Sequence, residues 1–154
     1  DIGAMTFRDG INWERIERSE GVYDFSDPRL AYINEAAKEG IDVTLVFNWG
    51  NVLYDGGFTP YTDAGRAAFA DFIVATLDHY DSIKSIEIGN EFNGNNYING
   101  PVLKAGYELR DDYYAALIDA VYAKVKAGHP DVTVLGGATH SIPVGYLKSL
   151  FEHG

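Results

Sequence analysis

Hydrophobic residues follow two different spacings along this chain. Short runs of apolar residues, in series or at alternate positions, predict strands over residues 4–8, 43–48, 85–90 and 132–136. Between them, longer segments repeat apolar residues every three or four positions, which is typical of helices that pack by one face. This alternation predicts an α/β fold with a parallel sheet and right-handed crossovers.

Residues that favour the beginning or the end of a helix stand between the predicted strands. A side-chain oxygen at the N-cap accepts a hydrogen bond from the first turn, and glycine favours the left-handed backbone that ends a helix. We expect one helix to end at Gly40 and another at Gly128. The expected helix beginnings are, in chain order, Asp27 with Pro28, Thr62 or Asp63, Asp111, and Pro143.

The predicted connections differ in length, and this difference places a candidate site. Connections from a helix to the next strand are short, whereas residues 9–26, 49–61 and 92–110 form long connections from a strand to the next helix. Long loops in compact domains are usually functional or disordered, and ligands of parallel α/β folds bind at the C-terminal ends of the strands. The polar residues expected at those ends are Arg8, Asn48, Asn90, Glu91 and His140.

The strand predicted over residues 85–90 carries the most informative alternation. Ile86 and Ile88 should point to one face, and Glu87, Gly89 and Glu91 to the other. Two carboxylates and a glycine make a poor core face, because burying an unpaired charge is unfavourable. An edge strand with one solvated face would also explain the pattern, but we favour a site for acid–base chemistry with Glu91 at the tip of the strand.

Composition and charge exclude several classes of protein. The chain has 154 residues, 46% of them hydrophobic and 23% charged, which predicts one globular domain over residues 1–154. The formal net charge of −11 argues against nucleic acid or an anionic membrane as a partner. No apolar run approaches the roughly 20 residues of a membrane span, and the opening residues show no signal-peptide pattern. With no cysteine, disulfides and thiol chemistry are excluded.

Two groups of motifs resemble those of a known enzyme clan. Residues 7–9 (Phe-Arg-Asp), 13–17 (Trp-Glu-Arg-Ile-Glu) and 21–25 (Gly-Val-Tyr-Asp-Phe) resemble the second strand and following loop of retaining glycoside hydrolases of the large (β/α)8-barrel clan. That clan includes cellulases, β-galactosidases, β-xylosidases and α-L-iduronidases. Residues 87–93 (Glu-Ile-Gly-Asn-Glu-Phe-Asn) resemble its fourth strand, where Trp-Asn-Glu-Pro-Asn is usual. The order and spacing of both groups agree with the clan.

The resemblance implies roles for individual residues. Glu91 would be the general acid/base, Asn90 would bind the 2-hydroxyl of the sugar or the nucleophile, and Arg8 would keep the nucleophile ionised and oriented. Retaining enzymes need two carboxyl groups roughly 5–5.5 Å apart, one to attack the anomeric carbon and one to protonate the leaving oxygen. Gly89 stands where the clan often has Trp, and Phe92 where Pro is frequent, and these departures leave the subfamily open.

The resemblance also implies that the chain covers only strands two to five of the barrel. A complete barrel takes about 250 residues, so we expect a partial (β/α)8 TIM barrel with four parallel strands and flanking helices. Residue Thr44 of strand 43–48 should face the barrel axis, and Phe47 the helices. The clan's nucleophile, a Glu on the seventh strand, is expected outside this chain. The implied function is therefore the N-terminal part of a retaining glycosidase that is inactive alone.

The alternative function is a non-catalytic carbohydrate-binding or interaction module on a truncated barrel. In either case the expected partners are an oligo- or polysaccharide, and either the remaining barrel strands or a second copy of the chain. No cofactor is expected. The resemblance favours a secreted or periplasmic location, which the residues themselves leave open.

Several loop residues are further candidates. Trp49, beside Asn48 at a strand tip, suits stacking on a sugar, and Asn93 follows Glu91 closely enough to contact a substrate. His140 could equally be a hydrogen-bond partner of the substrate or a helix cap. No two histidines stand at metal-ligand spacing, so no metal site is expected. A solvated charged loop is expected at Arg15, Glu17, Arg18 and Glu20.

Overall fold

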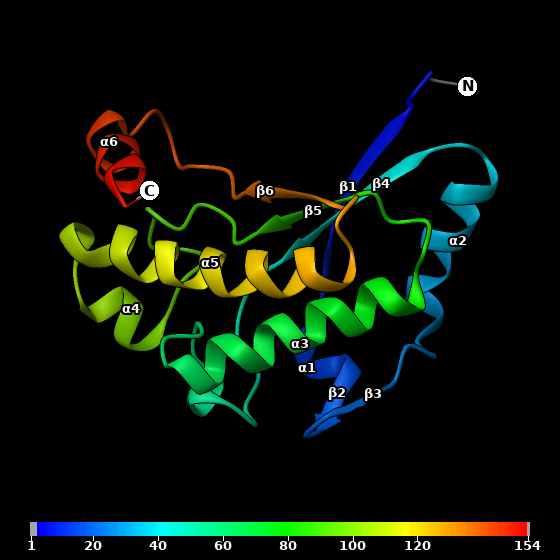
Figure 1. The fold of residues 1–154 in the computed structure, drawn as a ribbon, viewed down its shortest axis with the longest axis horizontal. Helices are drawn as coiled ribbons and strands as arrows, with labels where there is room; N and C mark the ends of the chain where they lie inside the picture. Colours follow the sequence, from blue (N-terminus) through cyan, green and yellow to red (C-terminus); the bar gives the residue numbers. More distant parts are fainter. Residues whose placement is uncertain (1–2, 154) are drawn as a thin grey trace.

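A computed structural model describes residues 3–153 of the chain as a parallel sheet covered by helices (Figure 1). The sheet has the order β1-β4-β5-β6. Its strands are β1 (Thr6–Ile11), β4 (Asp42–Phe47), β5 (Ser85–Ile88) and β6 (Thr133–Gly136), and a separate hairpin is formed by β2 (Glu17–Ser19) and β3 (Val22–Tyr23). The helices are α1 (Trp13–Ile16), α2 (Ala31–Lys38), α3 (Asp63–His79), α4 (Gly100–Lys104), α5 (Arg110–Gly128) and α6 (Val144–Glu152).

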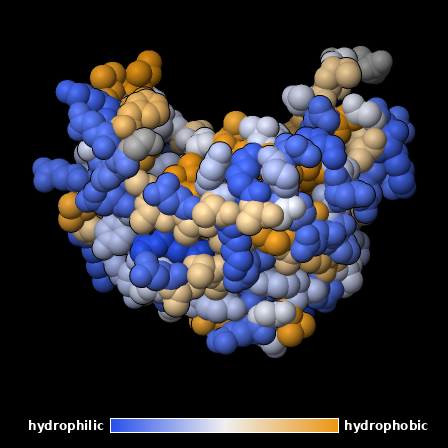
Figure 2. Space-filling view, viewed as in Figure 1, coloured by the Kyte–Doolittle hydropathy of each residue, from blue (hydrophilic) through white to orange (hydrophobic). Residues whose placement is uncertain are grey.

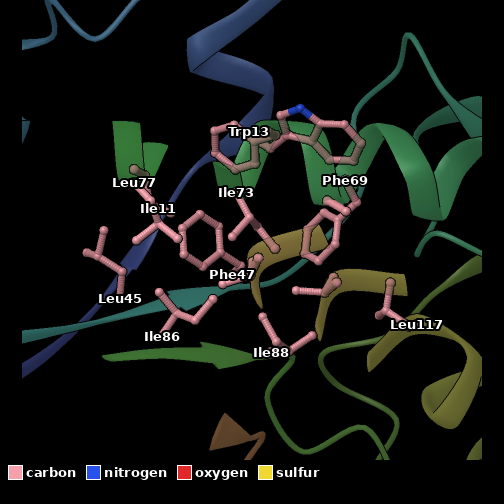
Figure 3. Close-up of a cluster of buried hydrophobic side chains, with 14 of the residues drawn as sticks. Ile11, Trp13, Leu45, Phe47, Phe69, Ile73, Leu77, Ile86, Ile88 and Leu117 are labelled. Carbon is pink, nitrogen blue, oxygen red and sulfur yellow. The ribbon is translucent and has the colours of Figure 1, made fainter. Parts of the chain in front are cut away.

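The hydrophobic core lies between one face of this sheet and the helices α3 and α5, which pack against each other (Figures 1 and 3). Leu45, Phe47, Ile86 and Ile88 point from β4 and β5 into this core, and each is fully buried. Large apolar residues of the helices meet them, as the period of 3.6 residues requires. The helix residues in this core are Phe69, Phe72, Ile73, Leu77, Tyr114, Leu117, Val121 and Val125.

The opposite face of the sheet is polar, as the alternation along the strands predicts. Arg8 lies level with Thr44, and Thr44 with Ser85, in the parallel register of β1, β4 and β5. The hydroxyl oxygens of Thr44 and Ser85 are 2.6 Å apart. Glu87 lies one step further along the same face. The expectation that Thr44 and Phe47 point to opposite faces is therefore confirmed.

The expected helix beginnings are close to those observed. The Asp27 side chain accepts a hydrogen bond from the N–H of Arg29, which starts the turn Pro28–Leu30 before α2. Thr62 rather than Asp63 caps α3, because its side chain accepts from the N–H of Gly65. Helices α5 and α6 begin at Arg110 and Val144, each within one residue of the prediction.

Strands β1 and β5 differ from the prediction by two residues or more at a boundary, whereas β4 and β6 agree within one residue. Strand β1 starts at Thr6 and runs to Ile11, rather than over residues 4–8, because its pairing with β4 continues until Ile11 lies level with Phe47. Strand β5 ends at Ile88, before the predicted residue 90, because Gly89 adopts a left-handed backbone with φ of +75°. Such a conformation favours glycine, which gives a physical reason for a glycine at this position.

A close approach between the ends of β5 and β6 requires a second glycine, Gly137. A Cβ atom added to Gly137 would lie 2.6 Å from the carbonyl oxygens of both Ile88 and Gly89. We expect Gly137→Ala to lower the free energy of unfolding by about 1–3 kcal/mol, because the strand ends must move apart. Urea unfolding followed by circular dichroism measures this change.

Gly145 in α6 offers a matched control for this prediction. A Cβ atom added there meets nothing within 4 Å. Gly145→Ala should raise the free energy of unfolding by roughly 0.5–1 kcal/mol, because alanine is the better helix former. Equal effects of the two substitutions would show that the contact at Gly137 does not limit the packing of β6.

Candidate active site

The polar face of the sheet carries an ion pair between Arg8 of β1 and Glu87 of β5. The Nε atom of Arg8 donates to Oε2 of Glu87 at 2.6 Å, and Nη2 donates to Oε1 at 2.8 Å. Nη2 also donates to Oδ1 of Asn90 at 2.9 Å, and the N–H of Ala138 donates to Oε1 of Glu87 at 2.9 Å. This bidentate geometry connects β1 to β5 and to the segment after β6, and both carboxylate oxygens of Glu87 accept hydrogen bonds.

The ion pair shifts the pKa values of both partners. Burial by itself would raise the pKa of Glu87, but the hydrogen bonds from Arg8 and from the N–H of Ala138 outweigh it, so this pKa lies below its ordinary value. The hydrogen bond to Glu87 raises the pKa of Arg8. Glu87 is therefore an ionised structural group at neutral pH and not a proton donor.

The lowered pKa of Glu87 predicts a pH-dependent contribution to stability. Because this pKa is lower in the folded state than in the unfolded state, the contribution is present above the ordinary value of 4.5 and is lost as the pH falls through the folded value. Part of the loss of stability between pH 6 and pH 3 should therefore disappear in Glu87→Gln. Urea unfolding across this pH range measures the free energy of unfolding at each pH. Glu39→Gln, at an exposed position, is the control. Identical pH profiles for wild type and Glu87→Gln would contradict the prediction.

Glu91 lies beyond the end of β5, and its backbone rather than the strand alternation places its side chain. It has φ of +45°, in the left-handed region that non-glycine residues rarely adopt. Its N–H donates to the carbonyl of Ala138 at 2.6 Å, and its own carbonyl accepts from the N–H of Gly94 at 2.7 Å. The side chain is 30% exposed, and its Oε2 lies 3.6 Å from Nδ1 of His140. An unusual backbone held by two hydrogen bonds is typical of a functional position.

The loop after Glu91 is tied to the loop after β6. Nδ2 of Asn93 donates to the carbonyl of His140 at 3.0 Å, and the N–H of His140 donates to Oδ1 of Asn93 at 2.8 Å. Asn93 is buried, so it acts here by holding His140 beside Glu91. Arg110, at the start of α5, donates from Nη1 to the carbonyls of Asn93 and Gly94 at 2.8 and 2.9 Å.

Trp49 and Tyr97 form an exposed aromatic pair on the loops after β4 and β5. Their ring centroids are 6.0 Å apart, and the residues are 42% and 36% exposed. Trp49 has φ of +67°, and Asn48, half-buried, immediately precedes it after the end of β4. Exposed aromatic rings beside polar groups suit stacking against the apolar face of a sugar.

The interpretation of Glu17 as part of a solvated loop is wrong. Its side chain is fully buried and accepts hydrogen bonds from Nε1 of Trp13 at 2.5 Å, from the hydroxyl of Tyr54 at 2.6 Å and from the N–H of Gly21 at 2.7 Å. Trp13 is also buried, stacked on Tyr54 and Phe72. Because Glu17 stands among charged residues, the sequence did not indicate that it is a buried hydrogen-bond acceptor. The only sequence signal for this role is a carboxylate four positions after a tryptophan.

Among residues 3–153, one group of side chains could bind a metal. Ligand atoms of Asp111, Asp112 and His153 lie within 4.8 Å of one another. The Ser149 hydroxyl and His153 both hydrogen bond to Asp111, so the group links α5 to α6. The spacing of the histidines in the sequence gave no sign of this group.

The sheet order, the parallel register and the helices on one face define part of a (β/α)8 TIM barrel of the kind found in glycoside hydrolases, as the sequence predicted. Asn90 and Glu91 follow the C-terminal end of β5, the edge where such barrels place their active sites. Arg8 lies in the middle of β1, so the prediction that it stands at a strand end is wrong, but its guanidinium reaches Asn90. No helix in the described part of the chain is long and apolar enough to span a membrane.

Two solved structures show this similarity. One is a family 39 glycoside hydrolase from the gut symbiont Bacteroides cellulosilyticus WH2, with a TM-score of 0.66 and 24% identity over 86% of this chain. The other is a β-glucosidase from Exiguobacterium marinum, with a TM-score of 0.65 and 16% identity over 89% of this chain. This chain spans only 26% and 34% of their lengths. Neither protein-family models nor curated proteins gave a match.

Proposed function

We propose that this chain is the N-terminal part of a retaining glycosidase that hydrolyses O-glycosidic bonds, with Glu91 as the general acid/base. The observation that carries the proposal is the position of Glu91. Its partly exposed carboxyl group stands at the C-terminal edge of the sheet, on a backbone held by Ala138 and Gly94. A proton donor in this reaction must reach the oxygen of the leaving group from a fixed position.

The two neighbouring carboxylates have different environments, and this supports the assignment. Arg8 and the N–H of Ala138 occupy both oxygens of Glu87, whereas the nearest ion-pair partner of Glu91 is His140 at 3.6 Å. Glu87 would keep Arg8 oriented, and Glu91 would exchange protons. Asn90 accepts from Arg8 through Oδ1, which leaves its Nδ2 to donate to the 2-hydroxyl of a sugar.

The nucleophile of the proposed mechanism belongs to a segment outside these residues. Arg8 is 49% exposed in spite of its pairing with Glu87, so a second carboxylate can approach its guanidinium from the open face of the sheet. The partners of the chain would be an oligo- or polysaccharide and the remaining strands of the barrel, with a second copy of the chain as the other way to supply strands.

The proposal is tested by following the anomer that is released first. The purified chain alone should not hydrolyse any aryl glycoside, because double displacement needs both carboxyl groups. The protein that includes the missing strands should release sugar with the anomeric configuration of its substrate, observed by proton NMR before mutarotation. First release of the opposite anomer would contradict retention. Sugar binding without turnover by that longer protein would favour the alternative, a non-catalytic carbohydrate-binding module.

A further inference from the structure

A polar pocket of about 500 Å³ lies beside Glu91. It is lined by the loop residues 93–96, by Tyr107 and Arg110 near the start of α5, and by His140. His140 belongs to the pocket and also lies 3.6 Å from Glu91, so the pocket and the proposed acid/base share one side chain. Figure 2 shows the molecule hollowed along the edge between α6 and the N-terminal end of β1.

Arg110 is the unusual member of this pocket, because it is a buried cation with only neutral hydrogen-bond acceptors. The residue is 6% exposed, and its guanidinium donates to the carbonyls of Asn93 and Gly94 and to Oδ1 of Asn95. Its Nε atom is buried and has no partner among the described residues. No carboxylate of residues 3–153 lies within ion-pair distance of it.

A buried charge normally has a counter-ion, because moving it out of water is unfavourable unless an opposite charge compensates it. The ring of Tyr107, with its centroid 5.9 Å from the guanidinium carbon, compensates only in part. An arginine has five N–H groups in a planar fork that matches carboxylate and sulfate oxygens. Three of them are used here, and the pocket is therefore chemically suited to an anion.

We propose that this pocket binds the leaving-group sugar of the substrate and that this sugar carries a carboxylate or a sulfate that pairs with Arg110. The inference rests on the proposed function of Glu91, because a general acid must stand next to the oxygen of the departing group. The space on the His140 side of Glu91 is then the place of the leaving group. The Nδ2 atom of Asn95 and the hydroxyl of Tyr107 are available to bind its neutral hydroxyls.

Binding to the chain itself tests this proposal without any need for turnover. The probes are glucuronate, glucose 6-sulfate and glucose, each titrated into the isotopically labelled chain. Binding is measured from the NMR signals of the backbone amides of Gly94, Asn95 and Asn96. We expect at least one of the two anionic sugars to bind about tenfold more tightly than glucose, which corresponds to one charge-assisted contact. Preference for glucuronate would identify a uronic acid, and preference for the sulfate a sulfated sugar.

Two variants with the same loss of charge separate the pocket from general electrostatics. Arg110→Gln should abolish the preference for anionic sugars. Arg66→Gln should retain it, because Arg66 pairs with Asp63 and the carbonyl of Tyr61 elsewhere in the fold. If Arg110→Gln disturbs the loop, the wild-type chain provides a second test. About 500 mM NaCl should lower the preference for the anionic sugars, because salt screens charges that are open to solvent, as the sugar's anion is before it binds.

Three results would overturn the proposal. These are equal affinities for the three sugars, signal changes outside the pocket, and binding of inorganic sulfate as tight as that of glucose 6-sulfate, which would show an anion site that does not recognise sugar. A failure of hydrolysis by the longer protein would leave these binding results unchanged, so the two proposals fail separately.

Discussion

Replacing Glu91 by glutamine is expected to lower the rate of glycosidic bond cleavage by about 10²–10⁴-fold in the protein that contains the complete barrel. The amide keeps the shape of the side chain and can still form a hydrogen bond, but it has no acidic proton for the leaving oxygen. Sugar binding should remain nearly unchanged. The measurement is the pre-steady-state rate of glycosylation, together with the dissociation constant of an unreactive sugar analogue.

The leaving group provides an internal control for this prediction. An aryl glycoside whose phenol is strongly acidic departs with little protonation, so its glycosylation should be slowed much less than that of an alkyl glycoside. Glu39→Gln, at the exposed C-terminal end of α2, should leave both rates unchanged. Equal losses for good and poor leaving groups in Glu91→Gln would argue that another group is the acid.

Replacing Glu17 by alanine is expected to destabilise the fold strongly. The substitution leaves the buried Nε1 of Trp13, the hydroxyl of Tyr54 and the N–H of Gly21 without their acceptor. Each unsatisfied buried polar group costs about 1–3 kcal/mol, so we expect a loss of roughly 3–5 kcal/mol in the free energy of unfolding. Urea unfolding followed by tryptophan fluorescence measures it, because Trp13 reports directly on this cluster.

Glu20 is the matched control for Glu17, since both carboxylates belong to the same charged stretch. Glu20 is exposed, and Glu20→Ala should change the free energy of unfolding by no more than about 0.5 kcal/mol. If Glu17→Ala were equally mild, water would have to reach the three donors, and the burial of this hairpin would be less complete than the structure shows.

The parts of the fold that follow from local periodicity could be read from the residues alone. Ile86 and Ile88 point into the core because a strand alternates its side chains, and Thr62 begins α3 because its oxygen accepts from the first turn. The long loops likewise pointed to the C-terminal edge of the sheet, where Asn90 and Glu91 follow β5, whereas Arg8 lies inside β1 because that strand continues to Ile11. These features depend on residues close together in the chain.

The burial of Glu17 could not be predicted from the charged stretch around it. Arg15, Arg18 and Glu20 are exposed, and only the fold of β2 and β3 against Tyr54 and Trp13 encloses the carboxyl group between them. A charged residue can be buried when groups elsewhere in the fold form hydrogen bonds with it. The residues next to it in the sequence do not indicate which groups these are.

The sequence by itself determined the class of fold and the order of the four sheet strands and the main helices between them, because hydrophobic spacing and capping act within a few residues. It did not predict the hairpin of β2 and β3 or the short helices α1 and α4. Only the tertiary structure decided how the site is built. It pairs Arg8 with Glu87, sets His140 beside Glu91 through Asn93, and buries Arg110 without a carboxylate among the described residues. These contacts join residues far apart in the chain, so they exist only once the strands lie side by side.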